Sequence, residues 1–257
     1  MKKFLCLLIF FCHQAYSQEL IIPAGKTKTL TDSERNLSLQ KLVLGDNVTI
    51  IIPASLDGWT VTANDVTIGN NVKILGDGAY GEHGLTGSSG NIATINSTRV
   101  IIRSGGDGGN GSTGKIIELN LKIRSIGSLM INVNGGNGGN GGNGRNGSKG
   151  QDATCSFPAR NGGNGGSGGR GGNGGDGGTV NIKYQVIGDI SLTNDKFIIK
   201  TEGGKAGYGG GPGIGGPGGF GITCRNGNQA PGFPGSSGWS GPDGVPGKNG
   251  SSSIEIF

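Results

Sequence analysis

The sequence predicts an all-β protein in which a β-solenoid-like layer of strands carries a bundle of glycine-rich hairpins in the polyglycine-II conformation. Three observations lead to this fold class. Short runs rich in Ile, Val and Thr recur along the chain and end at turns with Gly, Asn or Asp, as β-strands do. Between them, glycine occupies every third position over long stretches. No segment has the 3.6-residue apolar period of an amphipathic helix.

The composition also argues against an ordinary globule. Gly accounts for 59 of the 257 residues, about three times its usual share of ~7%. Glycine adds no side chain to a core and loses the most backbone entropy on folding. Stability must therefore come from something other than a large conventional core.

Residues 1–17 are predicted to be a secretory signal peptide. Lys2 and Lys3 precede a short apolar stretch, and the small residues Ala15 and Ser17 stand where a signal peptidase needs them. Neither this stretch nor any later apolar run is long enough to span a bilayer. We expect cleavage after Ser17 and a secreted, extracellular or cell-surface protein without a membrane span. The alternative is an uncleaved anchor at the membrane interface.

Residues 18–103 are predicted to form the β-solenoid-like N-terminal part. Within residues 37–75, strand-sized pieces follow one another in the strings "DNVTIII", "NDVTIG" and "NNVKIL". Each string repeats a turn followed by a strand, which is the pattern of successive solenoid rungs. The alternative is a small β-sandwich.

Residues 104–257 are predicted to alternate glycine-rich hairpins with β-strands. Glycine keeps a three-residue period in four runs, at 135–152, 162–178, 204–219 and 232–250. The flexibility of a linker depends only on its amino-acid composition, so a flexible linker would not be expected to keep a strict three-residue period. Polyproline-II geometry has three residues per turn, so the glycines would form a bare edge along each helix.

Collagen uses the same bare edge and is the first alternative for these runs. It requires many prolines, yet the first two runs contain none and mostly repeat Gly-Gly-Asn, although 232–250 is more collagen-like. Hairpin connections would also place antiparallel segments where collagen needs parallel ones. We therefore predict polyglycine-II helices packed side by side. They have no internal hydrogen bonds, so their backbone groups must bond to neighbouring helices.

A disulfide is predicted between Cys155 and Cys224. These cysteines lie in equivalent loops between glycine runs, and they are the only two that remain after the signal peptide. In an oxidising compartment they should pair, closing a ~70-residue loop for roughly 4 kcal/mol in the chain-entropy model. The alternatives are two free thiols or a bond between chains.

In its triplet runs, the sequence resembles the polyglycine-II bundles of springtail antifreeze proteins and of phage tail-fibre adhesins. Its general texture is similar to that of bacterial secreted proteins called collagen-like. The resemblance covers about residues 104–250. Loops at the distal end of the bundle carry receptor specificity in the phage adhesins, which implies a recognition role for residues 153–160 and 222–231 here.

Little in the sequence suggests catalysis. Beyond the signal peptide His83 is the only histidine, the acidic residues are scattered, and no Lys-Ser or Lys-Thr follows a glycine run as in a phosphate loop. Losing Lys2 and Lys3 lowers the net charge from +5 to about +3, too little and too spread out for a nucleic-acid surface. We predict no enzymatic activity, no cofactor, no metal site and no nucleic-acid partner, and the oligomeric state stays open.

A ligand-binding surface is predicted at the hairpin tips, from Phe157, Arg160, Arg225, Phe233 and Trp239. Aromatic side chains with arginines on loops are typical of binding surfaces, and arginine suits carboxylate or phosphate groups. A surface polysaccharide or a cell-surface receptor is the expected partner. Alternatively, the aromatic rings only plug the end of the bundle.

A regular asparagine column is the other candidate, formed by Asn137, Asn140, Asn143 and Asn146. It would either bind sugar hydroxyls or keep the bundle soluble. Together these features predict a secreted structural or adhesive protein of a cell surface or matrix. The first alternative is an ice-binding (antifreeze) protein, because a bundle presents side chains at a regular spacing of roughly 9 Å. The second is a carbohydrate-active enzyme on the solenoid part.

Overall fold

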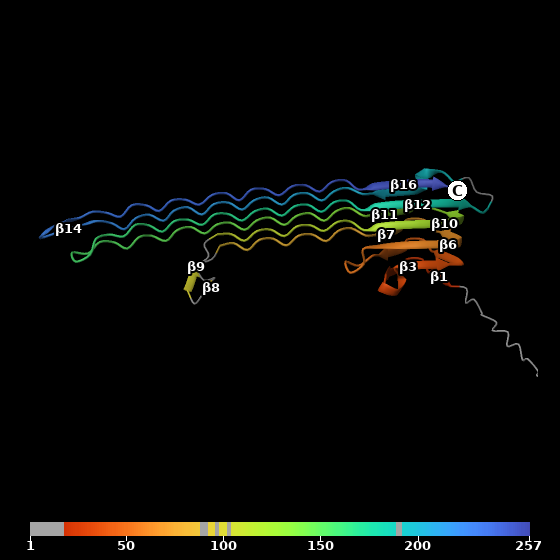
Figure 1. Ribbon diagram of the computed structural model, residues 1–257, viewed down its shortest axis with the longest axis horizontal. Helices are drawn as coiled ribbons and strands as arrows, with labels where there is room; N and C mark the ends of the chain where they lie inside the picture. Colours follow the sequence, from red (N-terminus) through yellow and green to blue (C-terminus); the bar gives the residue numbers. More distant parts are fainter. Residues whose placement is uncertain (1–17, 88–91, 96–97, 102–103, 189–191) are drawn as a thin grey trace, which may run out of the picture.

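The computed structural model describes residues 18–87, 92–95, 98–101, 104–188 and 192–257. The predicted signal peptide therefore lies outside the described residues. The described chain is rich in strands, and its helical content is two three-residue 3-10 turns, η1 (Asp32–Glu34) and η2 (Asn194–Lys196). This confirms the predicted all-β class. Figure 1 shows a block of strands at one end and long extended segments running away from it side by side.

Most strands belong to two parallel sheets. The first has the order β1-β4-β6-β10-β12-β16, and β3 also pairs with β6. Its strands are β1 (Glu19–Ile22), β3 (Asn36–Leu39), β4 (Lys41–Leu44), β6 (Gly58–Ile68), β10 (Ile116–Ile126), β12 (Thr179–Val186) and β16 (Ser251–Ile256). The second sheet has the order β13-β11-β7-β5-β2. Its strands are β2 (Thr27–Thr29), β5 (Thr49–Ile51), β7 (Val72–Leu75), β11 (Leu129–Asn132) and β13 (Phe197–Lys200).

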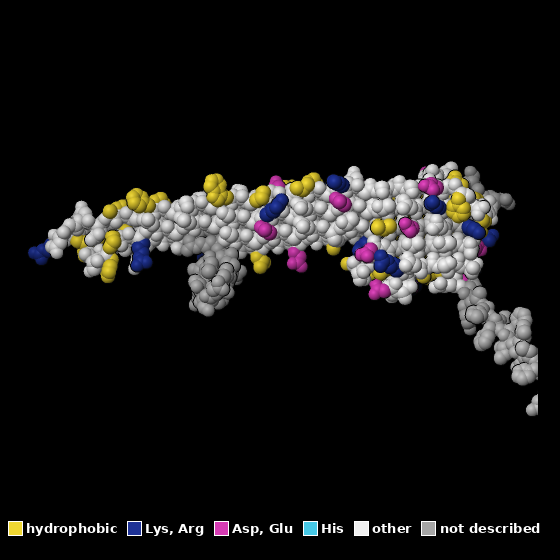
Figure 2. Space-filling model, in the orientation of Figure 1, with side chains coloured by type: hydrophobic (Ala, Val, Ile, Leu, Met, Phe, Trp, Pro, Cys, Tyr) yellow, Lys and Arg dark blue, Asp and Glu magenta, His cyan; other side chains and the backbone are white. Residues whose placement is uncertain are grey.

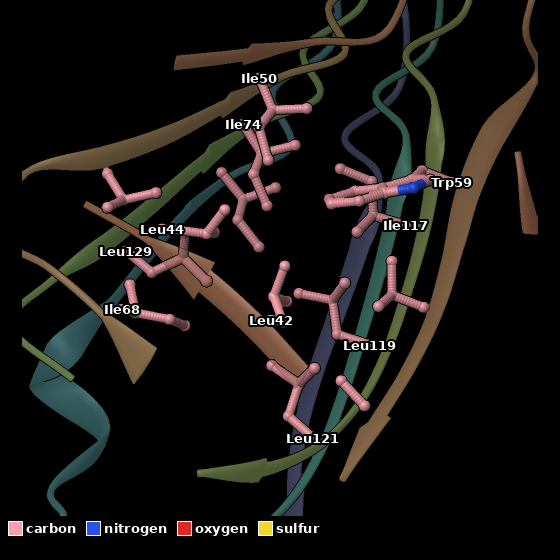
Figure 3. Packing of buried hydrophobic residues seen from close by; sticks show 14 of the residues in the cluster. Leu42, Leu44, Ile50, Trp59, Ile68, Ile74, Ile117, Leu119, Leu121 and Leu129 are labelled. Carbon is pink, nitrogen blue, oxygen red and sulfur yellow. The ribbon is translucent and has the colours of Figure 1, made fainter. Parts of the chain in front are cut away.

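The two sheets enclose a single hydrophobic core (Figure 3). Side chains of a strand point alternately to opposite faces, and β10 shows this clearly: Ile117, Leu119, Leu121 and Ile123 are buried, whereas the residues between them are more exposed. Buried residues from both sheets meet in this layer, among them Ile50, Trp59, Ile74, Leu129, Ile131, Val180, Ile182 and Tyr184.

Successive turns between the sheets stack on one another. Asn47 and Asn71 both have left-handed backbone, with φ values of 57° and 54°. The Asn71 Nδ2 group donates to Oδ1 of Asn47 at 2.8 Å, across 24 residues. The strings "DNVTIII" and "NNVKIL" therefore occupy equivalent positions. "NDVTIG" differs, because it lies in the second half of β6, in the other sheet.

Six glycine-rich segments extend from the strands and together form what we call the shaft. In chain order they are segment I (76–87), segment II (104–114), segment III (133–152), segment IV (160–178), segment V (201–220) and segment VI (232–250). Segments I, III and V leave the second sheet and run outward. Segments II, IV and VI return to the first sheet (Figure 1). Segments I and II, shorter than the four predicted runs, belong to the same array.

Backbone hydrogen bonds join each segment to its neighbours. In segment III, Gly138 donates its N–H to Lys205 of segment V, and Gly139 donates to Gly109 of segment II, both at 2.8 Å. Both bonds recur every three residues, those to segment V from Gly135 to Gly150 and those to segment II from Gly136 to Gly142. Glycine is required at these positions, because a β-carbon at Gly139 would overlap the carbonyl oxygen of Glu82. The bare glycine edges therefore let backbones approach closely, as the period predicts.

Candidate functional site

The far end of the shaft is closed by a disulfide. Cys155 lies in the loop between segments III and IV. Cys224 ends β14 (Ile222–Cys224), which pairs with β15 (Gly227–Gln229) in the hairpin between segments V and VI. The two cysteines form the predicted bond, with their Cα atoms 5.7 Å apart. This joins the two longest hairpins at their tips, which we call the tip of the shaft (Figure 1).

A depression of about 340 Å³ opens at the tip. Its lining residues are Gln151, Asp152, Thr154, Phe157, Pro158, Ala159 and Arg160. A tight turn shapes the loop, since Thr154 and Phe157 exchange backbone hydrogen bonds and the Phe157 N–H also donates to Oγ1 of Thr154 at 3.1 Å. The Phe157 ring is left 70% exposed beside the depression.

Asp152, the acidic residue that lines this depression, already has two hydrogen-bonding partners. Asp152 forms an ion pair with Lys149 at 2.8 Å, and its Oδ1 accepts the N–H of Phe220 at 2.7 Å. The pKa of Asp152 is lowered from its ordinary value, first by the hydrogen bond from Lys149 and then by the one from Phe220. Lys149 also lies 4.2 Å from the centre of the Phe220 ring, a cation–π contact. These contacts hold segment III to segment V at the tip.

The tip arginines are not paired in this way. Within the described residues, no carboxylate forms an ion pair with Arg160 or Arg225. The Arg160 backbone is held by bonds to Gln151 and Gly219, so its Cα is fixed while its guanidinium is unpaired. Figure 2 shows basic and hydrophobic side chains at this end of the shaft. The site therefore combines an exposed ring with an unpaired cation.

The structure brings only some of the predicted site residues together. Phe157 and Arg160 line the same depression, and Arg225 follows the bridged Cys224. Phe233 lies at the base of the tip, where its carbonyl accepts the N–H of Gly162. Trp239 lies in the shaft, two triplets farther back, with its N–H on Ser167.

The asparagine column has a role that neither sequence interpretation anticipated. Each of its Oδ1 atoms accepts a backbone N–H from segment V, sixty-eight residues later in the chain. The pairs are Asn134–Glu202, Asn137–Lys205, Asn140–Tyr208, Asn143–Gly211, Asn146–Ile214 and Asp152–Phe220, at 2.7–2.9 Å. Among the described residues these N–H groups have no backbone acceptor, so the column completes the bonding of the next segment.

Segment IV repeats this arrangement toward segment VI at an offset of 72 residues. Its acceptors pair as Asn161–Phe233, Asn164–Ser236, Ser167–Trp239, Asn173–Val245 and Asp176–Lys248, at 2.7–3.2 Å. His83 acts in the same way in segment I, because its Nδ1 accepts the N–H of Asn140 at 2.9 Å. His83 is thus engaged in the shaft.

In each column, one residue has a side chain that cannot accept a hydrogen bond. The residue at the matching offset in the next segment is a proline in both cases. Lys149 interrupts the column of segment III, and the residue 68 positions later is Pro217. Arg170 interrupts the column of segment IV, and the residue 72 positions later is Pro242. Proline has no N–H to donate, so an acceptor is missing only where no donor exists. This matching was present in the sequence and would have revealed the register of the segments.

A second depression, of about 440 Å³, lies on the outer face of the first sheet. Its lining residues are Glu118, Asn120, Asn181, Lys183, Ser253 and Glu255. Glu118 and Glu255 come from β10 and β16, which are separated by β12, so their backbones lie about 10 Å apart or more. Glu255 also pairs with Lys183 at 3.5 Å.

Comparison with protein-family models, with curated proteins and with solved structures found no match. Among the described residues, no helix has the length and apolar character needed to cross a membrane. The same residues contain no group of three or more His, Cys, Asp or Glu side chains placed to hold a metal ion.

Proposed function

We propose that this is a secreted, non-enzymatic adhesive or structural protein, in which a β-solenoid holds a polyglycine-II shaft that presents a ligand-binding tip. Parallel strands with stacked turns support the solenoid. Backbone bonds between segments that recur every three residues support polyglycine-II geometry. At ~3.1 Å per residue, segment III alone would extend about 60 Å from the strands.

The unpaired Arg160 beside the exposed Phe157 ring is the observation that carries the adhesive role. Along the shaft, side chains and backbone repeat the same bonds at each turn, which leaves little to distinguish one ligand from another. The tip differs, because it is irregular, braced by a disulfide and holds two arginines, Arg160 and Arg225, that form no ion pair within the described residues. An aromatic face suits a sugar ring, and a guanidinium suits a carboxylate or phosphate. An acidic surface polysaccharide is therefore the expected ligand class.

A glycan-binding screen of the purified protein tests this proposal. We expect binding to acidic glycans that falls at least tenfold in the Phe157→Ala/Arg160→Gln variant, with an unchanged melting temperature. The matched control is Leu85→Ala/Arg145→Gln, which also removes one apolar and one basic side chain, both on the shaft. An equal loss in the control, or unchanged binding in the tip variant, would place recognition elsewhere.

Ice binding ranks second. A regular column supports it, but the asparagine Oδ1 atoms already accept backbone N–H groups and are not free to order water. Thermal hysteresis measured on the same sample separates the two roles. The enzyme alternative would rest on Glu118 and Glu255. Glu255 is already paired with Lys183 at 3.5 Å, which weakens its support as a second catalytic carboxylate.

A further inference from the structure

Eleven Asn-Gly dipeptides occur along the chain, ten in the shaft and one in the tip. This dipeptide can lose its side-chain amide, because glycine has no β-carbon to keep its nitrogen away from the asparagine side chain. The glycine nitrogen attacks Cγ of the asparagine and forms a bond to it, while the Cγ–Nδ2 bond breaks. Ammonia leaves with the proton of the glycine N–H, and a succinimide ring remains. Water then opens this ring to aspartate or isoaspartate, so the reaction replaces a neutral amide with a carboxylate.

The shaft engages the glycine N–H of all ten of its dipeptides. Each donates to a backbone carbonyl of another segment at 2.7–2.9 Å, and the donors are Gly111, Gly135, Gly138, Gly141, Gly144, Gly147, Gly162, Gly165, Gly174 and Gly250. A nitrogen held in this way is not free to attack. The asparagine side chains are held as well, because each of the ten accepts a backbone N–H through Oδ1. Both reacting groups are therefore engaged at every shaft dipeptide.

Packing around these glycines also opposes the reaction. A β-carbon on any of the ten would overlap a backbone carbonyl of a neighbouring segment, as at Gly138 with Gly172. The glycine nitrogen and the asparagine Cγ can meet only if the side chain turns and the backbone shifts, and the neighbouring segments leave no room for that movement. The bonds and contacts that hold the shaft together therefore also protect its asparagines.

Asn226 and Gly227 form the eleventh dipeptide, at the turn between β14 and β15 in the tip. Both residues are exposed. Gly227 has a φ of 129°, and a β-carbon there would have no atom within 4 Å. Within the described residues, no hydrogen bond holds the Asn226 side chain. Gly227 pairs with Cys224 at the last rung of a hairpin of two short strands, and a hairpin of this kind opens locally with ease. The restraints of the shaft are therefore missing at this dipeptide.

The chain contains matched internal controls, because the tripeptide Arg-Asn-Gly occurs three times, at 145–147 in segment III, at 160–162 in segment IV and at 225–227 in the tip. In the two shaft copies, Gly147 donates its N–H to Ile214 and Gly162 donates to Phe233, both at 2.8 Å. The same local sequence has the same intrinsic reactivity in an unfolded chain. A difference between the three copies in the folded protein therefore measures the effect of structure.

We propose that Asn226 is a self-modifying site, at which the tip converts one amide into a carboxylate while the shaft keeps all ten of its asparagines. The new carboxylate is adjacent in the chain to Arg225, which forms no ion pair within the described residues. It competes with an acidic ligand for that guanidinium, so the tip loses affinity as the protein ages. This consequence rests on the proposed ligand-binding role of the tip, whereas the modification itself does not.

A time course of the purified protein at mildly alkaline pH, which promotes attack by the glycine nitrogen, tests the modification. Samples are digested at acidic pH, and mass spectrometry measures the conversion of each asparagine. In the folded protein we expect Asn226 to react at least roughly tenfold faster than Asn146 and Asn161. In urea the three sites should react at similar rates, because unfolding removes the bonds of the shaft. Similar rates in the folded protein would overturn the proposal.

Two variants test the consequence for binding. Asn226→Asp carries the charge of the product from the start, and Asn226→Gln keeps an amide whose longer side chain does not form the succinimide ring. During the time course the unchanged chain should lose affinity for acidic glycans a few-fold and approach Asn226→Asp, whereas Asn226→Gln should keep its affinity. The control Asn146→Asp adds the same charge to the shaft, where Asp152 and Asp176 already act as acceptors, and should bind as the unchanged chain does. Full binding by Asn226→Asp would overturn the effect on the ligand and remove Arg225 from the proposed binding surface, while the mass spectra alone decide the modification.

Discussion

Joint replacement of Arg170 and Pro242 tests whether side-chain acceptors align segments IV and VI. Pro242 has no N–H, and Arg170 has no acceptor at the facing position of its column. Pro242→Ala restores the N–H, and Arg170→Asn supplies an Oδ1 like those of Asn164 and Asn173. Only the double variant can join the new donor to the new acceptor.

The structure sets the size of the expected effect. Within the described residues Arg170 forms no ion pair, so Arg170→Asn alone should change stability little. Pro242→Ala alone should cost about 0.4–1 kcal/mol, because the unfolded chain gains freedom. The new hydrogen bond should contribute about 0.5–1.5 kcal/mol. We therefore expect a favourable coupling of that size, or about 1–6 °C in melting temperature.

Urea unfolding of the four proteins in this cycle measures the coupling. Hydrogen exchange of the residue 242 amide reports the bond directly: we expect fast exchange in Pro242→Ala and slow exchange in the double variant. The matched control combines Arg170→Asn with Pro246→Ala, which restores an N–H that does not face residue 170. Zero coupling, or equal coupling in the control, would refute the acceptor register.

Three further predictions concern the shaft and its tip. Gly168→Val should destabilise the protein by about 1–3 kcal/mol, because its β-carbon would overlap the carbonyl oxygen of Gly210 in segment V. The control Gly211→Val should change the free energy of unfolding by no more than about 0.5 kcal/mol. Equal melting temperatures for the two variants would contradict the packing. Replacing Cys155 and Cys224 by Ser should cost up to roughly 4 kcal/mol and raise hydrogen exchange first at the tip; uniform change along the shaft would argue otherwise. The lowered pKa of Asp152 means that its carboxylate stabilises the tip above its ordinary value of 3.8 and that this contribution is lost as pH falls through the lowered pKa. An NMR titration should show tip loosening only in that acidic range, and Asp152→Asn should abolish the transition.

The sequence predicted features that depend on local pattern. The three-residue period identified segments III to VI, because only glycine permits backbones to approach so closely. The equivalent loop positions identified the Cys155–Cys224 bond. The turns in "DNVTIII" and "NNVKIL" predicted the equivalent positions at which Asn47 and Asn71 stack. Each of these signals lies in a short stretch and needs no knowledge of distant neighbours.

The parts that were missed depend on which distant residues face one another. The role of the asparagine column requires the offset of 68 residues between segments III and V, and that of the segment IV acceptors requires the offset of 72 residues to segment VI. Trp239 was assigned to the tip because the fold-back point could not be located from a repeating run. Composition alone could not distinguish an asparagine that faces solvent from one that accepts a backbone bond.

Register is the problem that a glycine shaft must solve, because a triplet run looks the same after every slip of three residues. The strands supply the answer at one end. β11 pairs with β13 at an offset of 68, as in Leu129 with Phe197, and the acceptors of segment III keep the same offset. β12 pairs with β16 at 72, and segment IV keeps that offset as well. The buried side chains of the strands specify one register, since a slip would expose them. The proline and acceptor pairs maintain it along the shaft, and the disulfide locks it at the tip.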